Sequence, residues 1–205
     1  TTGNNTLSDG GINALGQAGD TLKGGTATDT YSVANSTDVI VDTGGTDTVN
    51  ATALSYNLNA NASTVENLNF IGTGAFTGTG NGLANVITGG AGADTLSGGI
   101  GNDTLIGNVG NDNLTGGTGD DNFTFNAKAF GADIITDFRK VGDLDLIDVS
   151  GLGIKLGDFN SIGKLSVAVV GGSSVITVLG GGANGGTITL SGFNKVVAAD
   201  FHFAP

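Results

Sequence analysis

Four aspartates lie nine residues apart in the middle of the chain, at Asp94, Asp103, Asp112 and Asp121. Each ends a glycine-rich stretch such as GGAGAD or GGIGND, and no Lys or Arg between Lys23 and Lys128 is available to neutralise it. Carboxylates and main-chain carbonyls are hard oxygen ligands, which suit Ca²⁺. Mg²⁺ fits less well because it demands a tight octahedron and keeps its water. Zn²⁺ is disfavoured because the chain has one His and no Cys. The pattern therefore indicates calcium chemistry.

An apolar residue follows each aspartate by two positions and indicates how the chain holds the carboxylates in place. These residues are Leu96, Leu105, Leu114 and Phe123. Glycine takes positive φ readily, so six residues of each repeat can form a tight turn. The remaining three can form a short strand with one inward side chain. Two repeats then close one coil, and successive coils stack as parallel sheets with strands about 4.7–4.9 Å apart.

In such a stack, residues eighteen positions apart lie on neighbouring coils. Asp94 then stacks on Asp112, and Asp103 on Asp121, with Asn85 next to Asp103. Two carboxylates at that spacing repel by about 3–4 kcal/mol at an effective dielectric constant of about 20. A cation between the coils would remove this repulsion.

The regular register ends near residue 125, because the position expected to follow Asp121 is Arg139, a cation. Before the regular repeats, Asp29 and Tyr31 keep the acid and apolar positions of a degenerate copy, and DVIVD and VENLNFIG indicate strands. After them, ADIITDF, KLSVAVV and GTITLSGF indicate short strands of an antiparallel cap. Three regions are expected: degenerate repeats and strands at 1–79, a calcium-binding roll at 80–125 and a C-terminal β cap at 126–205.

Composition restricts the partners. The 205 residues carry a formal net charge of −12, which argues against nucleic acid and anionic membranes as partners. No stretch approaches eighteen consecutive apolar residues, so membrane insertion is not expected. The absence of Cys means that stability in an oxidising compartment would come from something other than disulfides. The chain begins without Met, which suggests a fragment or a processed product.

Residues 89–124 resemble the GGxGxDxUx repeats of the RTX (repeats-in-toxin, haemolysin-type) calcium-binding family. The resemblance implies an all-β fold: a right-handed parallel β-roll with flanking strands and an antiparallel C-terminal β cap. It implies Ca²⁺ as the cofactor, bound by the four aspartates and Asn85. Main-chain carbonyls of the turns would complete the sites, and the residues concerned would be Gly89, Ala91, Gly98, Ile100, Gly107, Val109, Gly110, Gly117 and Gly119.

The same resemblance implies a secreted or cell-surface protein of a Gram-negative bacterium, exported unfolded by type I secretion machinery and folded by extracellular calcium. The final residues, VVAADFHFAP, could serve both as an edge strand and as part of the export signal. Two other functions remain open. One is a structural or adhesive subunit of a surface layer, matrix or filament, which would self-associate or bind cell-surface polysaccharide. The other is a polysaccharide-acting enzyme, but no GxSxG, HExxH or Cys nucleophile is present, so no catalytic residues are expected.

Several further acids admit two interpretations. Asp137, Asp143, Asp145 and Asp148 could form an additional calcium site, or they could be solvated loop residues and turn caps. Asp42 and Asp47 flank Gly44-Gly45 and are expected to be turn residues. His202 is expected at a strand edge rather than in a ligand or base role.

Overall fold

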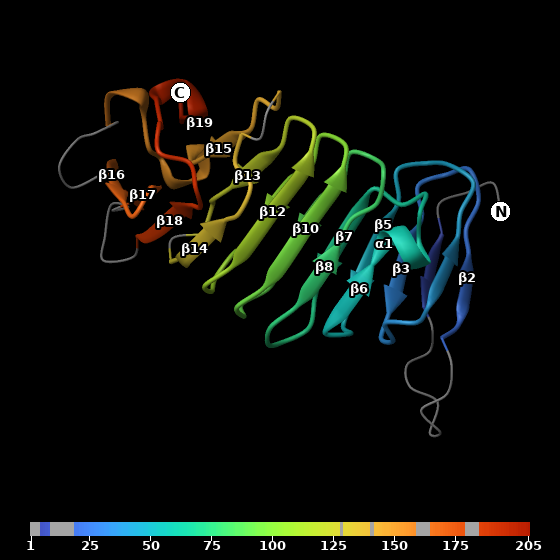
Figure 1. The fold of residues 1–205 in the computed structure, drawn as a ribbon. Coiled ribbons are helices and arrows are strands. Elements are labelled where there is room, and N and C mark those ends of the chain that lie inside the picture. Colours follow the sequence, from blue (N-terminus) through green and yellow to red (C-terminus); the bar gives the residue numbers. More distant parts are fainter. Residues whose placement is uncertain (1–4, 9–18, 128, 140–141, 159–164, 179–184) are drawn as a thin grey trace.

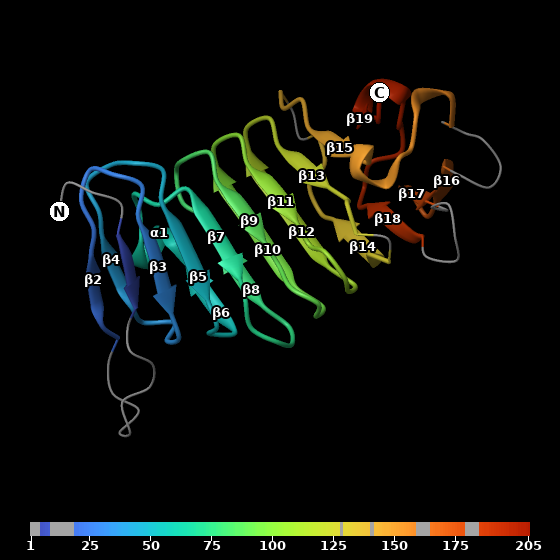
Figure 2. The ribbon, with the colours of Figure 1, turned by 180° about the vertical axis from the view of Figure 1, so that it is seen from behind.

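The computed structural model describes residues 5–8, 19–127, 129–139, 142–158, 165–178 and 185–205. Strands are the main regular structure of these residues, and they are wound into coils that stack along one axis with two long sheets facing each other (Figures 1 and 2). The described helices are short: α1 (Leu58–Asn61) and the 3-10 helices Ser150–Leu152, Leu156–Asp158 and Ala198–Asp200. The predicted all-β class and parallel β-roll are confirmed. No helix in the described ranges is long and apolar enough to span a membrane.

The first sheet contains nine strands, all paired in parallel. Figure 2 shows this sheet toward the viewer. In spatial order its strands are β1 (Thr6–Ser8), β3 (Thr30–Val33), β5 (Thr48–Ala51), β7 (Asn67–Phe70), β9 (Val86–Thr88), β11 (Thr104–Ile106), β13 (Asn122–Thr124), β15 (Leu146–Asp148) and β19 (Phe201–His202). Each of these strands up to β15 belongs to a successive coil.

The second sheet has eight strands and faces the viewer in Figure 1. Its strands are β6 (Ser55–Asn57), β8 (Thr77–Thr79), β10 (Thr95–Ile100), β12 (Asn113–Thr118), β14 (Gly131–Ile135), β18 (Gly186–Leu190), β17 (Ser173–Val178) and β16 (Leu165–Val170). A separate pair, β2 (Thr21–Lys23) and β4 (Val39–Val41), completes the N-terminal coils.

The register between coils in the regular repeats is eighteen residues, as predicted. Leu96 of β10 pairs with Leu114 of β12, and Leu105 of β11 pairs with Phe123 of β13. Directly after the regular repeats the spacing changes, while the pairing of β12 with β14 and of β13 with β15 stays parallel. The spacing becomes 21 residues between Asn113 of β12 and Ile134 of β14, and 24 residues between β13 and β15. Parallel pairing thus continues across residues 79/80 and 125/126, where the sequence indicated changes of organisation.

The C-terminal end combines two kinds of pairing. Strands β16, β17 and β18 pair antiparallel, which confirms the predicted antiparallel cap. However, β14, β15 and β19 join the roll in parallel, so the cap shares both of its sheets with the repeats. Exposed His202 lies on the edge strand β19, as expected, with its Nδ1 atom 3.3 Å from Asp148 Oδ2.

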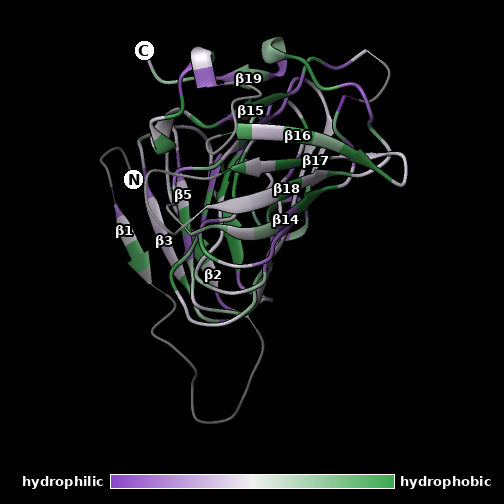
Figure 3. Ribbon diagram, turned by 90° about the vertical axis from the view of Figure 1, so that its left-hand side faces the viewer, coloured by the Kyte–Doolittle hydropathy of each residue, from purple (hydrophilic) through white to green (hydrophobic). Residues whose placement is uncertain are grey.

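The apolar residue of each repeat points into the space between the two sheets. Leu96, Leu105, Leu114 and Phe123 are each 0% exposed. Figure 3 views the molecule from the C-terminal end of the stack, where the two sheets enclose this interior. Each coil of the regular repeats contributes two of these residues to the core, one from each sheet, so the coil depends on both.

Truncating one of these residues is expected to destabilise the calcium-loaded protein strongly. Leu105→Ala should lower the free energy of unfolding by about 2–5 kcal/mol, because it leaves a cavity that a two-sheet interior closes poorly. Leu144→Ala is the matched control, since Leu144 is 64% exposed. Urea unfolding in excess calcium measures both, and equal midpoints for the two variants would contradict the proposed core.

Candidate metal centre

Each aspartate of the regular repeats stands immediately before a strand, and this places the four carboxylates on two edges of the roll. Asp103 and Asp121 precede β11 and β13 of the nine-stranded sheet, whereas Asp94 and Asp112 precede β10 and β12 of the other sheet. The neighbouring strands are in register, so the carboxylates of one edge lie one above the other.

Hydrogen bonds tie each carboxylate to the coil before it. The backbone N–H of Asp94 donates to Asp112 Oδ1 at 2.8 Å, and that of Asp103 donates to Asp121 Oδ1 at 2.9 Å. The N–H of Asn85 donates to Asp103 Oδ1 at 2.7 Å. The predicted pairing of residues eighteen apart, including Asn85 beside Asp103, is therefore confirmed.

The partner predicted after Asp121 is wrong. The N–H of Asp121 donates to Asp145 Oδ1 at 3.0 Å, and the N–H of Arg139 donates to the other oxygen of Asp145 at 2.6 Å. Arg139 itself pairs with Asp200 at 3.0 Å. The segment from β13 to β15, which includes β14, spans 24 residues, six more than a regular repeat pair. Counting eighteen residues from Asp121 therefore reaches Arg139, whereas the strand register places Asp145 next in the ladder.

The ladder of carboxylate and amide side chains extends beyond the regular repeats in both directions. A residue with a side-chain carboxylate or amide precedes every strand of the nine-stranded sheet. These residues are Asn5, Asp29, Asp47, Glu66, Asn85, Asp103, Asp121, Asp145 and Asp200. On the other edge the N–H of Asp112 donates to Asp133 Oδ1 at 2.8 Å. The sequence signal for this ladder was an acid or amide directly before each strand-like run. The unequal spacing between these residues made the signal hard to detect.

Three of the four remaining C-terminal acids have distinct roles. Asp137 is buried and accepts hydrogen bonds from the N–H groups of Gly116 and Gly117 in β12 at 2.9 and 3.0 Å, so it binds the neighbouring coil rather than solvent. Asp145 belongs to the ladder and is 3% exposed, and Asp148 lies beside His202. Within the described ranges these acids do not form a common metal-sized cluster with Asp143.

The second carboxylate oxygens provide a test of whether the edges suit a hard cation. Asp103 and Asp112 are each only 1% exposed, and the Oδ2 atom of each is buried without a hydrogen-bond partner. An unpartnered buried carboxylate oxygen is costly unless a cation or a proton compensates it. The donor set is oxygen only, as Ca²⁺ prefers. The residues present therefore fit calcium.

Glycines keep open the space around these oxygens. A Cβ on Gly98 would collide with Asp103 Oδ2 and lie 2.6 Å from the carbonyl oxygen of Gly116. A Cβ on Gly107 would likewise collide with Asp112 Oδ2. At Gly98, a carboxylate oxygen and a main-chain carbonyl of the next coil thus converge where the first glycine of the repeat lacks a side chain.

The structure places the predicted carbonyl ligands in the segments that lead to the two edges; Gly98 and Ile100 lie at the end of β10 and Gly117 lies in β12, and the others lie outside the strands. Those before Asp94 and Asp112 are Gly89, Ala91, Gly107, Val109 and Gly110, and those before Asp103 and Asp121 are Gly98, Ile100, Gly117 and Gly119. One carbonyl is already engaged, because Asn108 Nδ2 donates to the oxygen of Gly89 at 2.8 Å. Asn108 replaces a repeat glycine and adopts φ 73°, a conformation that Asn tolerates better than most residues.

Burial without a nearby cation makes these carboxyl groups hard to ionise. Desolvation raises the pKa of Asp103 and of Asp112 to about 6, and that of Asp121 to about 7. The pKa of Asp133 rises to about 8 for the same reason. In the absence of metal the ladder therefore opposes folding at neutral pH.

The calcium-free protein is expected to be more folded at pH 4.5 than at pH 7.5. The folded-state pKa values lie above the ordinary aspartate value, so the folded state binds more protons between about pH 4 and pH 7. The resulting stabilisation is complete below the unfolded pKa and is lost as the pH rises through 6 to 7. Circular dichroism of dilute calcium-free protein measures this, with sedimentation as a check on association near the isoelectric point. Greater β-sheet content at pH 7.5 would contradict the desolvation argument.

Comparison with known proteins agrees with this geometry. The family of RTX calcium-binding nonapeptide repeats, in four copies, matches residues 79–114 and 97–127. The solution structure of the AlgE6R3 subunit of the Azotobacter vinelandii mannuronan C5-epimerase is 33% identical, with a TM-score of 0.50, and the match covers 64% of this chain and 78% of that chain. The AlgE6R2 subunit of the same epimerase is 29% identical over 63% of this chain and 91% of that one, with a TM-score of 0.45. No curated protein matches. The family match and the similarity to the AlgE6R3 subunit, together with the regular strand register and the oxygen-lined edges, show that the chain belongs to the RTX calcium-binding repeat family.

Proposed function

We propose that this chain is the calcium-dependent folding module of a secreted bacterial protein, exported by type I machinery and ordered by extracellular calcium. The observation that carries the proposal is the buried ladder of carboxylates. Asp103, Asp112 and Asp121 are each at most 3% exposed, and burial raises the pKa of each carboxyl group. Such a ladder disfavours folding where calcium is scarce and favours it where calcium is abundant.

The proposed ligands are the four repeat aspartates, Asn85 and the turn carbonyls on the same edges. Asp145 and Asp133 extend the two edges by one coil each and are proposed as additional ligands, because their Oδ1 atoms repeat the hydrogen bond made by the regular aspartates. Calcium, when bound, would neutralise the stacked carboxylates. The chain itself supplies their alignment, through the strand register, and the open space, through the first glycine of each repeat.

The proposed export role assigns part of the signal to the C-terminal residues, and their structure is compatible with it. The segment 195–205 contains β19 and carries Asp200 as its one acid. A chain ending at Asn194 should therefore be exported poorly by a matching type I system, compared with the full chain. A His202→Ala variant is the control, because His202 is exposed and its change leaves the segment in place. Full export of the shortened chain would contradict the signal assignment.

A structural subunit is the second candidate. Among the described strands, β1 and β19 end one sheet and β6 and β16 end the other, so each lacks one strand neighbour. Edge strands can pair with another copy of the chain. Molecular mass in excess calcium distinguishes the two functions, because only the structural subunit requires self-association. The similarity to the AlgE6R3 subunit of an epimerase favours the first function, with this chain as an accessory module attached to an enzyme.

A further inference from the structure

Three buried acids gather at the N-terminal end of the roll, outside the residues that match the repeat family. They are Asp29, Asp42 and Asp47, and one carboxylate oxygen of each lies within 4.8 Å of the others. Their exposed fractions are 0%, 7% and 0%. Asp42 and Asp47 flank the turn at Gly44-Gly45, as expected, but both are buried, whereas most turn acids are solvated.

The cluster differs in composition from a regular repeat edge. Asp29 and Asp47 precede β3 and β5 and occupy the usual acid positions of the ladder. Asp42 begins the turn DTGGTD, at the position that Gly107 holds in GNVGND. A Cβ on Gly24, one coil earlier, would collide with the carboxylates of Asp42 and Asp29. A third carboxylate therefore projects into the space that a regular repeat leaves open.

Hydrogen bonds account for most of the carboxylate oxygens in this cluster. Asp29 accepts from the backbone and side chain of Asn5 and from the N–H of Gly25. Asp42 accepts from the hydroxyl of Tyr31 and, at 2.8 Å, from the N–H of Gly44. These bonds fix the orientation of two of the three carboxylates.

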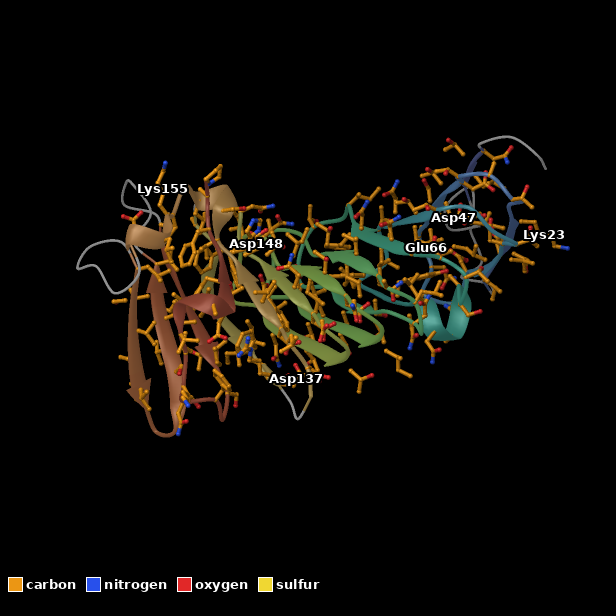
Figure 4. The ribbon with its side chains drawn as sticks, turned by 90° about the horizontal axis from the view of Figure 1, so that it is seen from above. Lys23, Asp47, Glu66, Asp137, Asp148 and Lys155 are labelled. Carbon is orange, nitrogen blue, oxygen red and sulfur yellow. The ribbon has the colours of Figure 1, made fainter. Side chains whose placement is uncertain are left out.

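Asp47 retains one unsatisfied oxygen. Its Oδ1 atom accepts from the N–H of Asp29 at 2.7 Å, but Oδ2 is buried without a hydrogen-bond partner. The Asp47 side chain contacts that of Asp42, and Glu66 is a further acid nearby. Lys23, the basic residue nearest in sequence, is exposed, and Figure 4 shows it pointing outward, away from Asp47. The unpartnered oxygen therefore faces acids.

We propose that Asp29, Asp42 and Asp47 form a separate calcium site, with three side-chain carboxylates around one ion. Hard oxygen donors at this spacing suit Ca²⁺, and a larger ligand charge strengthens calcium binding. Tyr31 acts as a positioning residue, because its hydroxyl holds Asp42 in place. The competing arrangement is a proton shared by Asp42 and Asp47, with no ion bound.

Terbium luminescence can test this site selectively. Tb³⁺ takes the oxygen sites of Ca²⁺ and emits when a nearby tyrosine is excited. The chain has two Tyr and no Trp. A Tyr56→Phe background leaves Tyr31 as the one donor. Tyr31 lies on β3, four strands from β11 and so about 19 Å from the edge at Asp103 at ordinary strand spacing. Strong emission excited through tyrosine would thus report the N-terminal cluster.

The Tyr56→Phe protein should show tyrosine-sensitised terbium emission that millimolar calcium displaces. Asp42→Asn or Asp47→Asn, which preserve shape, should weaken terbium affinity about tenfold or more through the loss of one ligand charge. Asp20→Asn is the control, because Asp20 is an exposed acid of the same coils and its loss should leave the emission unchanged.

Absent emission, or emission unchanged by both substitutions, would overturn the site and favour the shared proton. Circular dichroism of the same samples during a calcium titration reports the regular repeats separately. A retained calcium response without tyrosine-sensitised emission would therefore refute this site and leave the proposed folding function standing.

Discussion

Removing calcium at neutral pH is expected to unfold most of the roll. Binding to the folded state alone stabilises it by about 2.7 kcal/mol per site when free calcium is 100-fold above the dissociation constant. Two or more sites along the edges would thus contribute an amount comparable with the whole stability of a small domain. The interior cannot compensate, because each coil of the regular repeats buries only two apolar repeat residues between its sheets, such as Leu96 and Leu105.

Far-ultraviolet circular dichroism measures this effect in chelator and in 10 mM calcium. Calcium should raise the β-sheet signal, with a midpoint near 10⁻⁴–10⁻³ M, the range typical of extracellular modules. The same concentration of magnesium is the matched control and should leave the chain largely unfolded. A β-sheet spectrum that is identical in chelator and in calcium would contradict coupled folding.

Asp103→Asn is expected to raise the calcium concentration needed for folding about tenfold, through the loss of one ligand charge. Asparagine can still accept the hydrogen bond from the N–H of Asn85, so the change removes charge with little loss of shape. The unpartnered Oδ2 atom of Asp103 is the atom that the substitution alters. The folding midpoint in a calcium titration measures the shift.

Asp120→Asn is the control for this variant, because Asp120 is an exposed neighbour of the ladder. Its midpoint should stay close to that of the unaltered chain. Asp121→Asn should resemble Asp103→Asn, because Asp145 continues the ladder beyond Asp121. A shift for Asp120→Asn as large as that for Asp103→Asn would show that overall charge, rather than the stacked edge, controls calcium binding.

The central repeats were predictable because one short period determines turns, strands and register together. The apolar residue of each repeat must face the interior, and a slip by one residue would turn it outward. Leu96, Leu105 and Leu114 therefore fix the pairing of coils from the sequence alone. The aspartate two positions earlier is carried to the sheet edge by the same constraint.

The parts that escaped prediction lie where loops change length. Strand pairing keeps β15 in register after a 24-residue interval, and longer loops cost little free energy. Asp145 thus reaches the position that counting assigns to Arg139. The Asp42 cluster was missed for another reason: Asp42 comes eleven residues after Tyr31 in the chain, and only folding brings its carboxylate to the Tyr31 hydroxyl.

A crystal structure of the protein grown in calcium would test the central claim most directly. The expected result is ions along the two edges of the roll, ligated by Asp103 and Asp121 on one edge and by Asp94 and Asp112 on the other. Their shells should be completed by turn carbonyls of adjacent coils. An ordered roll in saturating calcium whose four aspartates bind no ion would contradict the claim.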